Sequence, residues 1–330
     1  FDSIMQTFGE AAPETSQVAQ RHEQEAEALK HLRGAHVLLV EDNEINQQVA
    51  LEILQGAGLI VTVANDGQEA VNAVKESHYD AVLMDIQMPV MDGYEATKRI
   101  RNSECGMRNK KGKDSDLKSK IQGVPIIAMT AHAMAGDEKK SIEAGMNDHV
   151  TKPIDPDQLF ATLLKWIKPV TERAAVPKSL PASGGPQILD AAPEPDQAMP
   201  EEDELPASLP GFDLAVGLSR LMGNKTLYRK LLLDFGANYG GVVSEIREAL
   251  AVDDFEQAHS LVHNLKGLAG NLEATELQTA AVKMETLVKG QTKETTSEKD
   301  LKQKFTDLEK ALEQALNAVQ ALGFPPEEII

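Results

Sequence analysis

The sequence lacks the features that mark secreted and membrane-spanning proteins. It contains a single cysteine, Cys105, which excludes an internal disulfide and fits a reducing compartment. No apolar run approaches the ~18 residues that a membrane span needs, and no basic and apolar signal peptide opens the chain. Since the first residue is not Met, we expect the chain to be a fragment. These absences predict a cytoplasmic segment that makes no membrane contact.

Basic and aromatic residues are also scarce. Lys and Arg number 33 against 52 Asp and Glu, and the resulting net charge of −19 argues against broad binding to nucleic acid or anionic membranes. Aromatic residues make up 4% of the chain and hydrophobic residues 42%, which fits helix-rich globular domains. A length of 330 residues suggests two domains with connecting segments.

Prolines and acids gather in residues 169–208. This stretch holds eight of the chain's 16 prolines, and eight acidic residues against two basic ones. Such a composition cannot bury enough apolar surface to order itself. It predicts a disordered linker between one domain at residues 34–168 and another at residues 209–325.

The first domain is organised around Asp80–Gly93, DAVLMDIQMPVMDG. Residues 81–84 read as a short buried strand that ends in Asp85, and the turn residues that follow start a helix at Tyr94. An ordinary strand-to-helix loop with an acidic cap is the alternative for this stretch taken alone.

Other polar residues follow other predicted strands. The predicted strand HVLLV at 36–40 is followed by Glu41 and Asp42. The predicted strand at 124–129 is followed by Thr130, and the one at 148–151 is followed by Lys152. With residues 59–64 as a further strand, the pattern predicts an α/β, doubly wound, parallel five-stranded sheet. The carboxyl ends of such strands converge in one crevice.

These residue types suit phosphoryl transfer to a carboxylate. Asp85 would be the nucleophile that becomes an acyl phosphate, while Glu41 and Asp42 offer hard oxygen ligands for Mg²⁺. Thr130 and Lys152 would contact the phosphoryl oxygens. An aspartate-nucleophile phosphatase would need a second Asp two residues after Asp85, where Gln87 stands.

Residues 34–168 resemble a response-regulator receiver domain, which has a flavodoxin-like fold. The resemblance implies Mg²⁺ bound by Glu41, Asp42, Asp85 and the backbone carbonyl of Gln87. It also implies a cis peptide before Pro153 and a switch aromatic three residues before Lys152, a place that His149 takes here. Residues 102–123 depart from the family as a basic insertion, either a solvated loop or a docking site for a partner.

The second domain shows helical spacing only. Apolar residues recur at three- and four-residue intervals and predict an all-α antiparallel helical bundle. The expected helices are 225–238, 242–251, 254–271, 275–289 and 298–322. In the helix that Asp254 caps, His263, Lys266 and Gly267 fall opposite the apolar stripe, so we expect His263 on an exposed face.

HNLKGLAGNL, which contains His263, resembles the phosphorylated segment of histidine phosphotransfer (HPt) domains. The resemblance implies that His263 is the phosphoacceptor and that Lys266 and Gly267 assist it. An isolated surface His is the first alternative. A metal site shared by His259 and His263 is the second, although no nearby third ligand is evident.

Together these features resemble the C-terminal part of a bacterial hybrid sensor histidine kinase, whose parent could be anchored in the inner membrane. We expect a phosphorelay between Asp85 and His263 and onward to a downstream response regulator receiver domain. The upstream histidine kinase core, expected in the same polypeptide, has no ATP-binding motif in this chain. Residues 1–9 resemble the tail of another receiver, and residues 10–33 read as a helical connector. A phosphorylation-gated binding scaffold without transfer is the competing function.

Overall fold

The computed structural model describes residues 29–102, 121–130, 135–169, 205–289 and 298–323. The chain divides into two compact units, and each is described by itself. We call the elements from β1 to α7 the sheet unit and those from α8 to α13 the helical unit. The predicted tail at residues 1–9 lies outside the described residues, as does most of the connector, the basic insertion and the linker.

The sheet unit contains five parallel strands. They are β1 (His36–Val40), β2 (Ile60–Ala64), β3 (Ala81–Asp85), β4 (Ile126–Thr130) and β5 (Asp148–Thr151). Their order in the sheet is β2-β1-β3-β4-β5. This is the flavodoxin-like order of a doubly wound fold, in which ligands bind at the carboxyl ends of the strands. The fold class expected from the sequence is confirmed.

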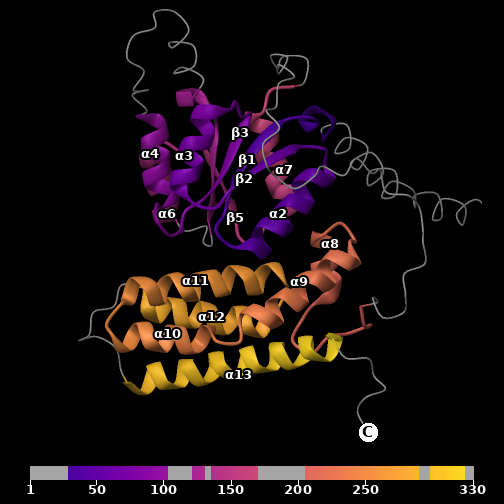
Figure 1. Ribbon diagram of the computed structural model, residues 1–330, viewed down its shortest axis with the longest axis vertical. Coiled ribbons are helices and arrows are strands. Elements are labelled where there is room, and N and C mark those ends of the chain that lie inside the picture. The colour runs from indigo at the N-terminus through magenta and orange to yellow at the C-terminus, as the bar shows by residue number, and fades with distance from the viewer. Residues whose placement is uncertain (1–28, 103–120, 131–134, 170–204, 290–297, 324–330) are drawn as a thin grey trace, which may run out of the picture. The chain divides into compact units, whose positions relative to one another are not determined.

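Helices cover both faces of this sheet (Figure 1). The helices α2 (Glu44–Gly56) and α7 (Pro156–Trp166) lie on one side, and α3 (Gly67–Glu76), α4 (Gly93–Arg101) and α6 (Ala135–Ala144) lie on the other. Every residue of the central strands β3 and β4 is therefore buried. Strands covered on both faces read as continuous apolar runs, which is why the sequence pattern located them.

Aspartate and asparagine side chains fix where the helices of the sheet unit begin. Asp66 accepts hydrogen bonds from the backbone of Gln68 and Glu69 at the start of α3, and Asp92 accepts one from Glu95 at the start of α4. Asn43 does the same for α2. Each cap pairs amide groups that the first helical turn leaves without partners.

The helical unit consists of six helices in the described residues. They are α8 (Leu214–Arg220), α9 (Lys225–Asn238), α10 (Val242–Ala251), α11 (Phe255–Asn271), α12 (Thr275–Val288) and α13 (Glu298–Gly323). The last five match the predicted helices, and α11 packs against both α10 and α12. Tyr228 and Phe235 of α9 are fully buried, and the ring of Phe235 stacks on that of Tyr239 at a centroid distance of 5.7 Å.

The short helix α8 is an addition to the sequence prediction. It has seven residues, too few for an apolar stripe to repeat. Its N-cap is Asp213, whose side chain accepts a hydrogen bond from the backbone N–H of Val216. A Cβ atom at Gly217 would overlap the ring of Tyr228, so this helix packs closely on α9.

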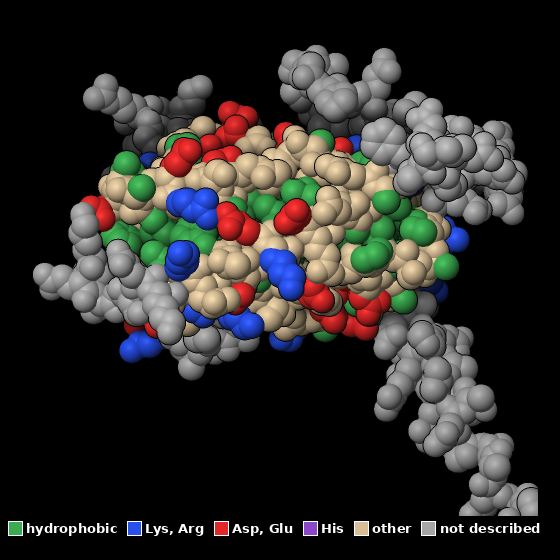
Figure 2. All heavy atoms as spheres, turned by 90° about the horizontal axis from the view of Figure 1, so that it is seen from below, with side chains coloured by type: hydrophobic (Ala, Val, Ile, Leu, Met, Phe, Trp, Pro, Cys, Tyr) green, Lys and Arg blue, Asp and Glu red, His purple; other side chains and the backbone are tan. Residues whose placement is uncertain are grey.

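Acidic and basic side chains are interspersed on the face shown in Figure 2, with hydrophobic side chains between them. In the helical unit, Arg247 Nη2 of α10 lies 2.5 Å from Glu309 Oε1 of α13. The negative net charge is thus not gathered in a single patch on this face. None of the described helices combines the length and hydropathy needed to cross a bilayer.

Candidate functional site

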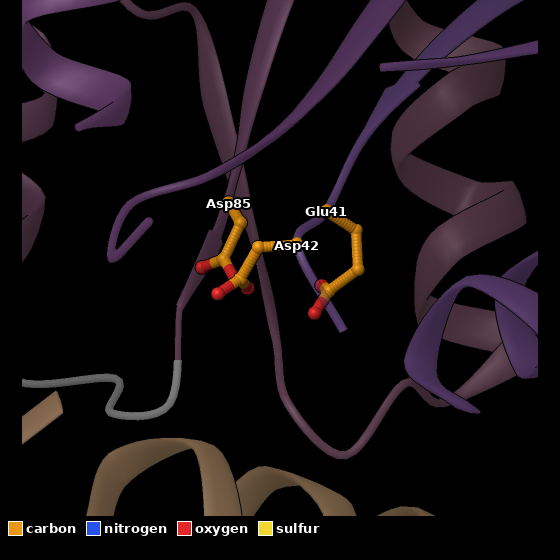
Figure 3. Close-up of side chains that lie close together, drawn as sticks. All are labelled: Glu41, Asp42 and Asp85. Atoms are coloured by element: carbon orange, nitrogen blue, oxygen red, sulfur yellow. The ribbon is translucent and has the colours of Figure 1, made fainter. Parts of the chain in front are cut away.

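Strand register brings three carboxylates together at the carboxyl end of the sheet. Val40 of β1 pairs with Met84 of β3, so Glu41 continues β1 beside Asp85, and Asp42 follows it. One oxygen of each carboxylate lies within 4.8 Å of the others (Figure 3). Glu41 and Asp85 are each 2% exposed. Carboxylates this close repel one another unless a cation neutralises them.

The donor set of this cluster fits a hard divalent cation. It offers only carboxylate oxygens, which are the ligands that Mg²⁺ and Ca²⁺ take in proteins. Among the described residues, this is the only group of three Asp, Glu, His or Cys side chains close enough to share an ion. The alternative metal site at His259 and His263 is not among such groups.

Thr130 and Lys152 lie at the same edge of the sheet. Asp85 pairs with Met129, and Thr130 is the next residue of β4. Thr130 pairs with Thr151, the last residue of β5, and Lys152 follows it. The peptide bond between Lys152 and Pro153 is cis, as the family resemblance implied. The convergence of these five residues on one edge of the sheet is therefore confirmed, while their roles stay predictions.

The loop after β3 returns tightly to Asp85. Gln87 N donates a 3.3 Å hydrogen bond to Asp85 Oδ1, and Gly93 N donates a 3.0 Å bond to Ile86 O. A Cβ atom at Gly93 would overlap the Asp85 carbonyl oxygen. Val90 has a φ of 66° and is 85% exposed at the tip of this loop. Glycine at position 93 is thus a steric requirement of the site.

His149, the residue at the switch position, lies on β5 beside Ala128 of β4. It is half-buried, and its backbone N–H donates a 2.9 Å hydrogen bond to Asp148 Oδ1. Its role as a switch stays a prediction.

In the helical unit, His263 lies against a carboxylate of the neighbouring helix. Its Nδ1 is 2.6 Å from Oε1 of Glu285 on α12. The other oxygen of Glu285 accepts a 2.7 Å hydrogen bond from Lys266 Nζ. The side chains of His263, Lys266 and Glu285 are 10%, 5% and 3% exposed. Because α12 packs beside α11, Glu285 covers one edge of the ring, and the exposure of the opposite edge stays a prediction.

His263 and Glu285 differ in their charge near neutral pH, because their pKa values are shifted by different causes. Burial lowers the pKa of His263 to about 4, although the hydrogen bond to Glu285 acts in the opposite direction. Burial would raise the pKa of Glu285, but hydrogen bonds from His263 and Lys266 outweigh it and bring that pKa to about 2. Near neutral pH the imidazole is therefore neutral and the carboxylate ionised.

Sequence reasoning missed Glu285. On α12 the buried residues include Leu277, Ala281, Met284 and Val288, and Glu285 lies one turn after Ala281 on the same stripe. A glutamate at a core position of an amphipathic helix needs a partner, since burying a lone carboxylate is costly. A charged residue at an apolar position of the helical pattern is the feature of the sequence that could have identified Glu285.

Gly267 has no side chain and is not crowded by the rest of the helical unit. Apart from its own helix backbone and its two chain neighbours, no described residue of the helical unit would lie within 4 Å of a Cβ atom there. A glycine inside a helix costs ~1 kcal/mol relative to alanine. The open space is consistent with the assisting role that the resemblance assigns to Gly267.

Two protein families match the chain. Residues 37–164 match the response regulator receiver domain, and residues 230–322 match the Hpt domain. The two matches fall on the sheet unit and on the helical unit, respectively.

Similar proteins include sensor protein GacS of Pseudomonas syringae pv. syringae, 32% identical over 285 residues, which are 85% of this chain and 27% of that protein. Hybrid signal transduction histidine kinase I of Dictyostelium discoideum is 42% identical over 132 residues, 38% of this chain and 7% of that protein. Among solved structures, the receiver domain of sensor histidine kinase PA1611 from Pseudomonas aeruginosa PAO1, with magnesium in its active-site cleft, is 41% identical. That match covers 40% of this chain and 97% of the other, with a TM-score of 0.34.

The chain spans about a quarter of the length of the GacS relative, and the match covers 85% of this chain. The chain therefore combines a response regulator receiver domain with an Hpt domain, the receiver and phosphotransfer region of proteins related to hybrid sensor histidine kinases.

Proposed function

We propose that this chain passes a phosphoryl group between Asp85 of the receiver domain and His263 of the Hpt domain. The observation that carries the proposal is the cluster of Glu41, Asp42 and Asp85 at the carboxyl end of the sheet. Such a cluster is unfavourable without a cation, and with one it suits a carboxylate that accepts a phosphoryl group.

Each of the receiver residues has a separate role in that transfer. Glu41, Asp42 and Asp85, with the backbone carbonyl of Gln87, would hold Mg²⁺, which neutralises the charge between the carboxylates and the incoming phosphoryl oxygens. Asp85 attacks phosphorus with one carboxylate oxygen. The Lys152 ammonium and the Thr130 hydroxyl bind phosphoryl oxygens and stabilise the charge that spreads over them.

The Hpt residues act on the same group. A nitrogen of His263 forms the new bond to phosphorus, and the ammonium of Lys266 attracts the phosphoryl oxygens. The open space beside Gly267 gives those oxygens room at the helix surface.

For the parent protein we propose a kinase core upstream, in the same polypeptide, as the source of the phosphoryl group. A downstream response regulator receiver domain would be its destination. We place this relay in the cytoplasm, since acyl phosphate chemistry draws on cytoplasmic phosphoryl donors and no described helix spans a bilayer.

Radiolabelled acetyl phosphate tests the proposal on the full chain. Label on Asp85 is an acyl phosphate, which hydroxylamine cleaves, whereas label on His263 is a phosphoramidate that acid removes and base does not. We expect both kinds of label in the original chain. Asp85→Asn should abolish both, and His263→Gln should leave only the hydroxylamine-sensitive label.

Exposed residues of the same types serve as controls for this experiment. Asp157→Asn on α7 and His78→Gln between α3 and β3 should label as the original chain does. A chain that labels at Asp85 but never at His263 would be the phosphorylation-gated scaffold instead.

A further inference from the structure

We propose that Arg220 of the Hpt domain is a docking residue for the receiver domain: its guanidinium donates hydrogen bonds to an oxygen acceptor at the rim of the receiver's phosphoacceptor site. This inference rests on the proposed function and adds a contact that would hold the two domains together during transfer. It depends on where Arg220 lies relative to His263 and on the hydrogen-bond donors that the helical unit leaves unused.

Arg220 lies at the end of the helix that carries His263. It is the last residue of α8, and its Nη2 pairs with Oε1 of Glu273, which stands two residues after the end of α11. With a rise of ~1.5 Å per residue, that end of α11 is roughly 12 Å from His263. A compact domain of the receiver's size has a radius of gyration of ~14 Å. A receiver domain that covers His263 is therefore wide enough to contact Arg220 as well.

The side of α11 between these two places carries glycine. His263, Gly267 and Gly270 follow one another at intervals of four and three residues, so they form one row along the helix. A Cβ atom at Gly270 would lie 2.6 Å from Nε2 of Gln278, so a larger residue would have to displace that side chain. Neither glycine has a side chain that would hold a partner away from the helix. A partner seated on His263 can therefore extend along this row to the end of α11.

The helical unit uses only part of the hydrogen-bonding capacity of Arg220. A guanidinium has five N–H donors in a planar fork and no acceptor. Within the helical unit the structure records one acceptor for it, Oε1 of Glu273. Nε of Arg220 has no hydrogen-bond partner among the described residues. Donors left over in this way select an oxygen acceptor, a backbone carbonyl or a carboxylate, on the docked partner.

The rest of α8 is fastened so that the guanidinium keeps its place. The backbone N–H of Asp213 donates a 3.0 Å hydrogen bond to Glu273 O. A Cβ atom at Gly217 would lie 2.3 Å from the Tyr228 hydroxyl oxygen, and that hydroxyl donates a 2.8 Å hydrogen bond to Leu272 O. The start and the middle of α8 are therefore held against the segment that follows α11. A donor that is already in place loses less conformational entropy when a partner docks.

The charge of the receiver site favours a cationic docking residue. The cluster of Glu41, Asp42 and Asp85 places three carboxylates at the carboxyl edge of the sheet. The ammonium of Lys152, at the same edge, offsets one of them. A bound Mg²⁺ would offset the other two, and the phosphoryl group adds negative charge again. Such an edge attracts a guanidinium, so we expect Arg220 to strengthen docking.

Transfer between two chains separates docking from chemistry. The donor is a full chain that carries His263→Gln and is labelled at Asp85, and the acceptor is a full chain that carries Asp85→Asn. Because the donor is the same throughout, any competition from its own Hpt domain cancels between acceptors. The rate of His263 labelling is measured at rising acceptor concentration. Adding Arg220→Ala to the acceptor should raise the half-saturating concentration on the order of tenfold or more, since a charge-assisted contact is lost, and should leave the maximal rate unchanged.

A double variant of the acceptor separates a docking role from a structural one. Arg220→Glu with Glu273→Arg exchanges the two charges, which keeps the ion pair that fastens α8 but removes the guanidinium from position 220. This acceptor should unfold near the original temperature, whereas its half-saturating concentration should be raised as in Arg220→Ala. The matched control is Arg247→Gln, since Arg247 also pairs with a glutamate of the helical unit. It should not alter docking.

A folded Arg220→Ala acceptor that saturates at the original concentration would overturn the inference. Recovery of the original half-saturating concentration by the double variant would overturn it as well, because Arg220 would then serve only to fasten α8. Absence of His263 label from every acceptor, including the one with Asp85→Asn alone, would instead contradict the proposed function.

Discussion

The carbonyl oxygen of Asp85 occupies the place where a Cβ atom on Gly93 would lie. Ile86 Cα is 3.0 Å from that position, so backbone surrounds it on two sides. Strand β3 and the start of α4 therefore pack closely together because residue 93 has no side chain.

The first prediction is that Gly93→Ala displaces the loop that carries Gln87 and disrupts the site. Backbone cannot give way as a flexible side chain can, so we expect a loss of about 1–3 kcal/mol in stability and little labelling of Asp85 by acetyl phosphate. Thermal unfolding and labelling measure the two effects. Gly123→Ala is the matched control, because a Cβ atom there would meet nothing within 4 Å. Equal labelling of both variants would contradict the steric argument.

The second prediction concerns the divalent cation. Labelling of Asp85 should need Mg²⁺ and should stop in excess chelator, since Glu41 and Asp42 would otherwise repel the phosphoryl group. Glu41→Gln should weaken Mg²⁺ binding on the order of tenfold or more, as measured by calorimetry of the full chain. The exposed Glu95→Gln on α4 is the control. Undiminished labelling in chelator would remove the metal assignment.

The third prediction is a loss of stability of the Hpt domain in acid. Unfolded His263 takes up a proton near its ordinary pKa of 6.5, whereas the folded pKa is about 4, so stability falls as pH drops from about 6.5 to 4. Glu285 has a folded pKa of about 2 against an ordinary 4.5, so its contribution is lost from about pH 4.5 to 2. Protonation of His263 and protonation of Glu285 both lower the stability of the Hpt domain as the pH falls.

Urea unfolding followed by circular dichroism, at a series of pH values, measures this dependence. His263→Gln removes the first group and should flatten the curve between pH 6.5 and 4. His78→Gln, on the surface of the receiver domain, should leave it unchanged. An original chain whose Hpt stability is constant over this range would contradict the burial of a neutral His263.

The receiver site could be predicted from the sequence because topology alone determines it. Buried parallel strands read as apolar runs, and a polar residue directly after each run must lie at the carboxyl edge of the sheet. Asp85 and Thr130 were located in this way, without any side-chain geometry. The helix boundaries followed from caps such as Asp254, which accepts a hydrogen bond from Gln257.

The environment of His263 could not be predicted in the same way. Helical spacing gives the face of α11 on which His263 lies, but it does not say which neighbouring helix covers that face or what it carries. Glu285 is 22 residues away in sequence and reaches His263 only because α11 and α12 pack side by side. The same limit applies to α8, whose two turns are too short to repeat a pattern.

The last prediction concerns Arg101, which joins the two ends of the basic insertion. Its guanidinium donates to the carbonyl oxygens of Gln122, Val124 and Gly145 at 2.9, 2.8 and 2.9 Å, and to Asn147 Oδ1 at 2.7 Å. Arg101 ends α4, directly before the insertion at residues 102–123. Gln122 lies at the end of the insertion, and Val124 directly follows it. The residues that flank the insertion are thus held by one side chain, whatever lies between them.

Replacing residues 103–120 with a short Gly/Ser link should therefore leave the receiver fold intact. A shorter loop also costs slightly less closure entropy, ~0.6 kcal/mol for each halving of its length. Arg101→Ala should instead destabilise the domain by on the order of 2–3 kcal/mol, because it removes four hydrogen bonds, two of them part-buried. Arg101→Lys should recover only part of this, since an ammonium cannot reproduce the planar fork of a guanidinium. Thermal unfolding of the three variants shows whether Arg101 or the insertion stabilises the receiver domain. A shortened chain that unfolds at as low a temperature as Arg101→Ala would show that the insertion itself supports the fold.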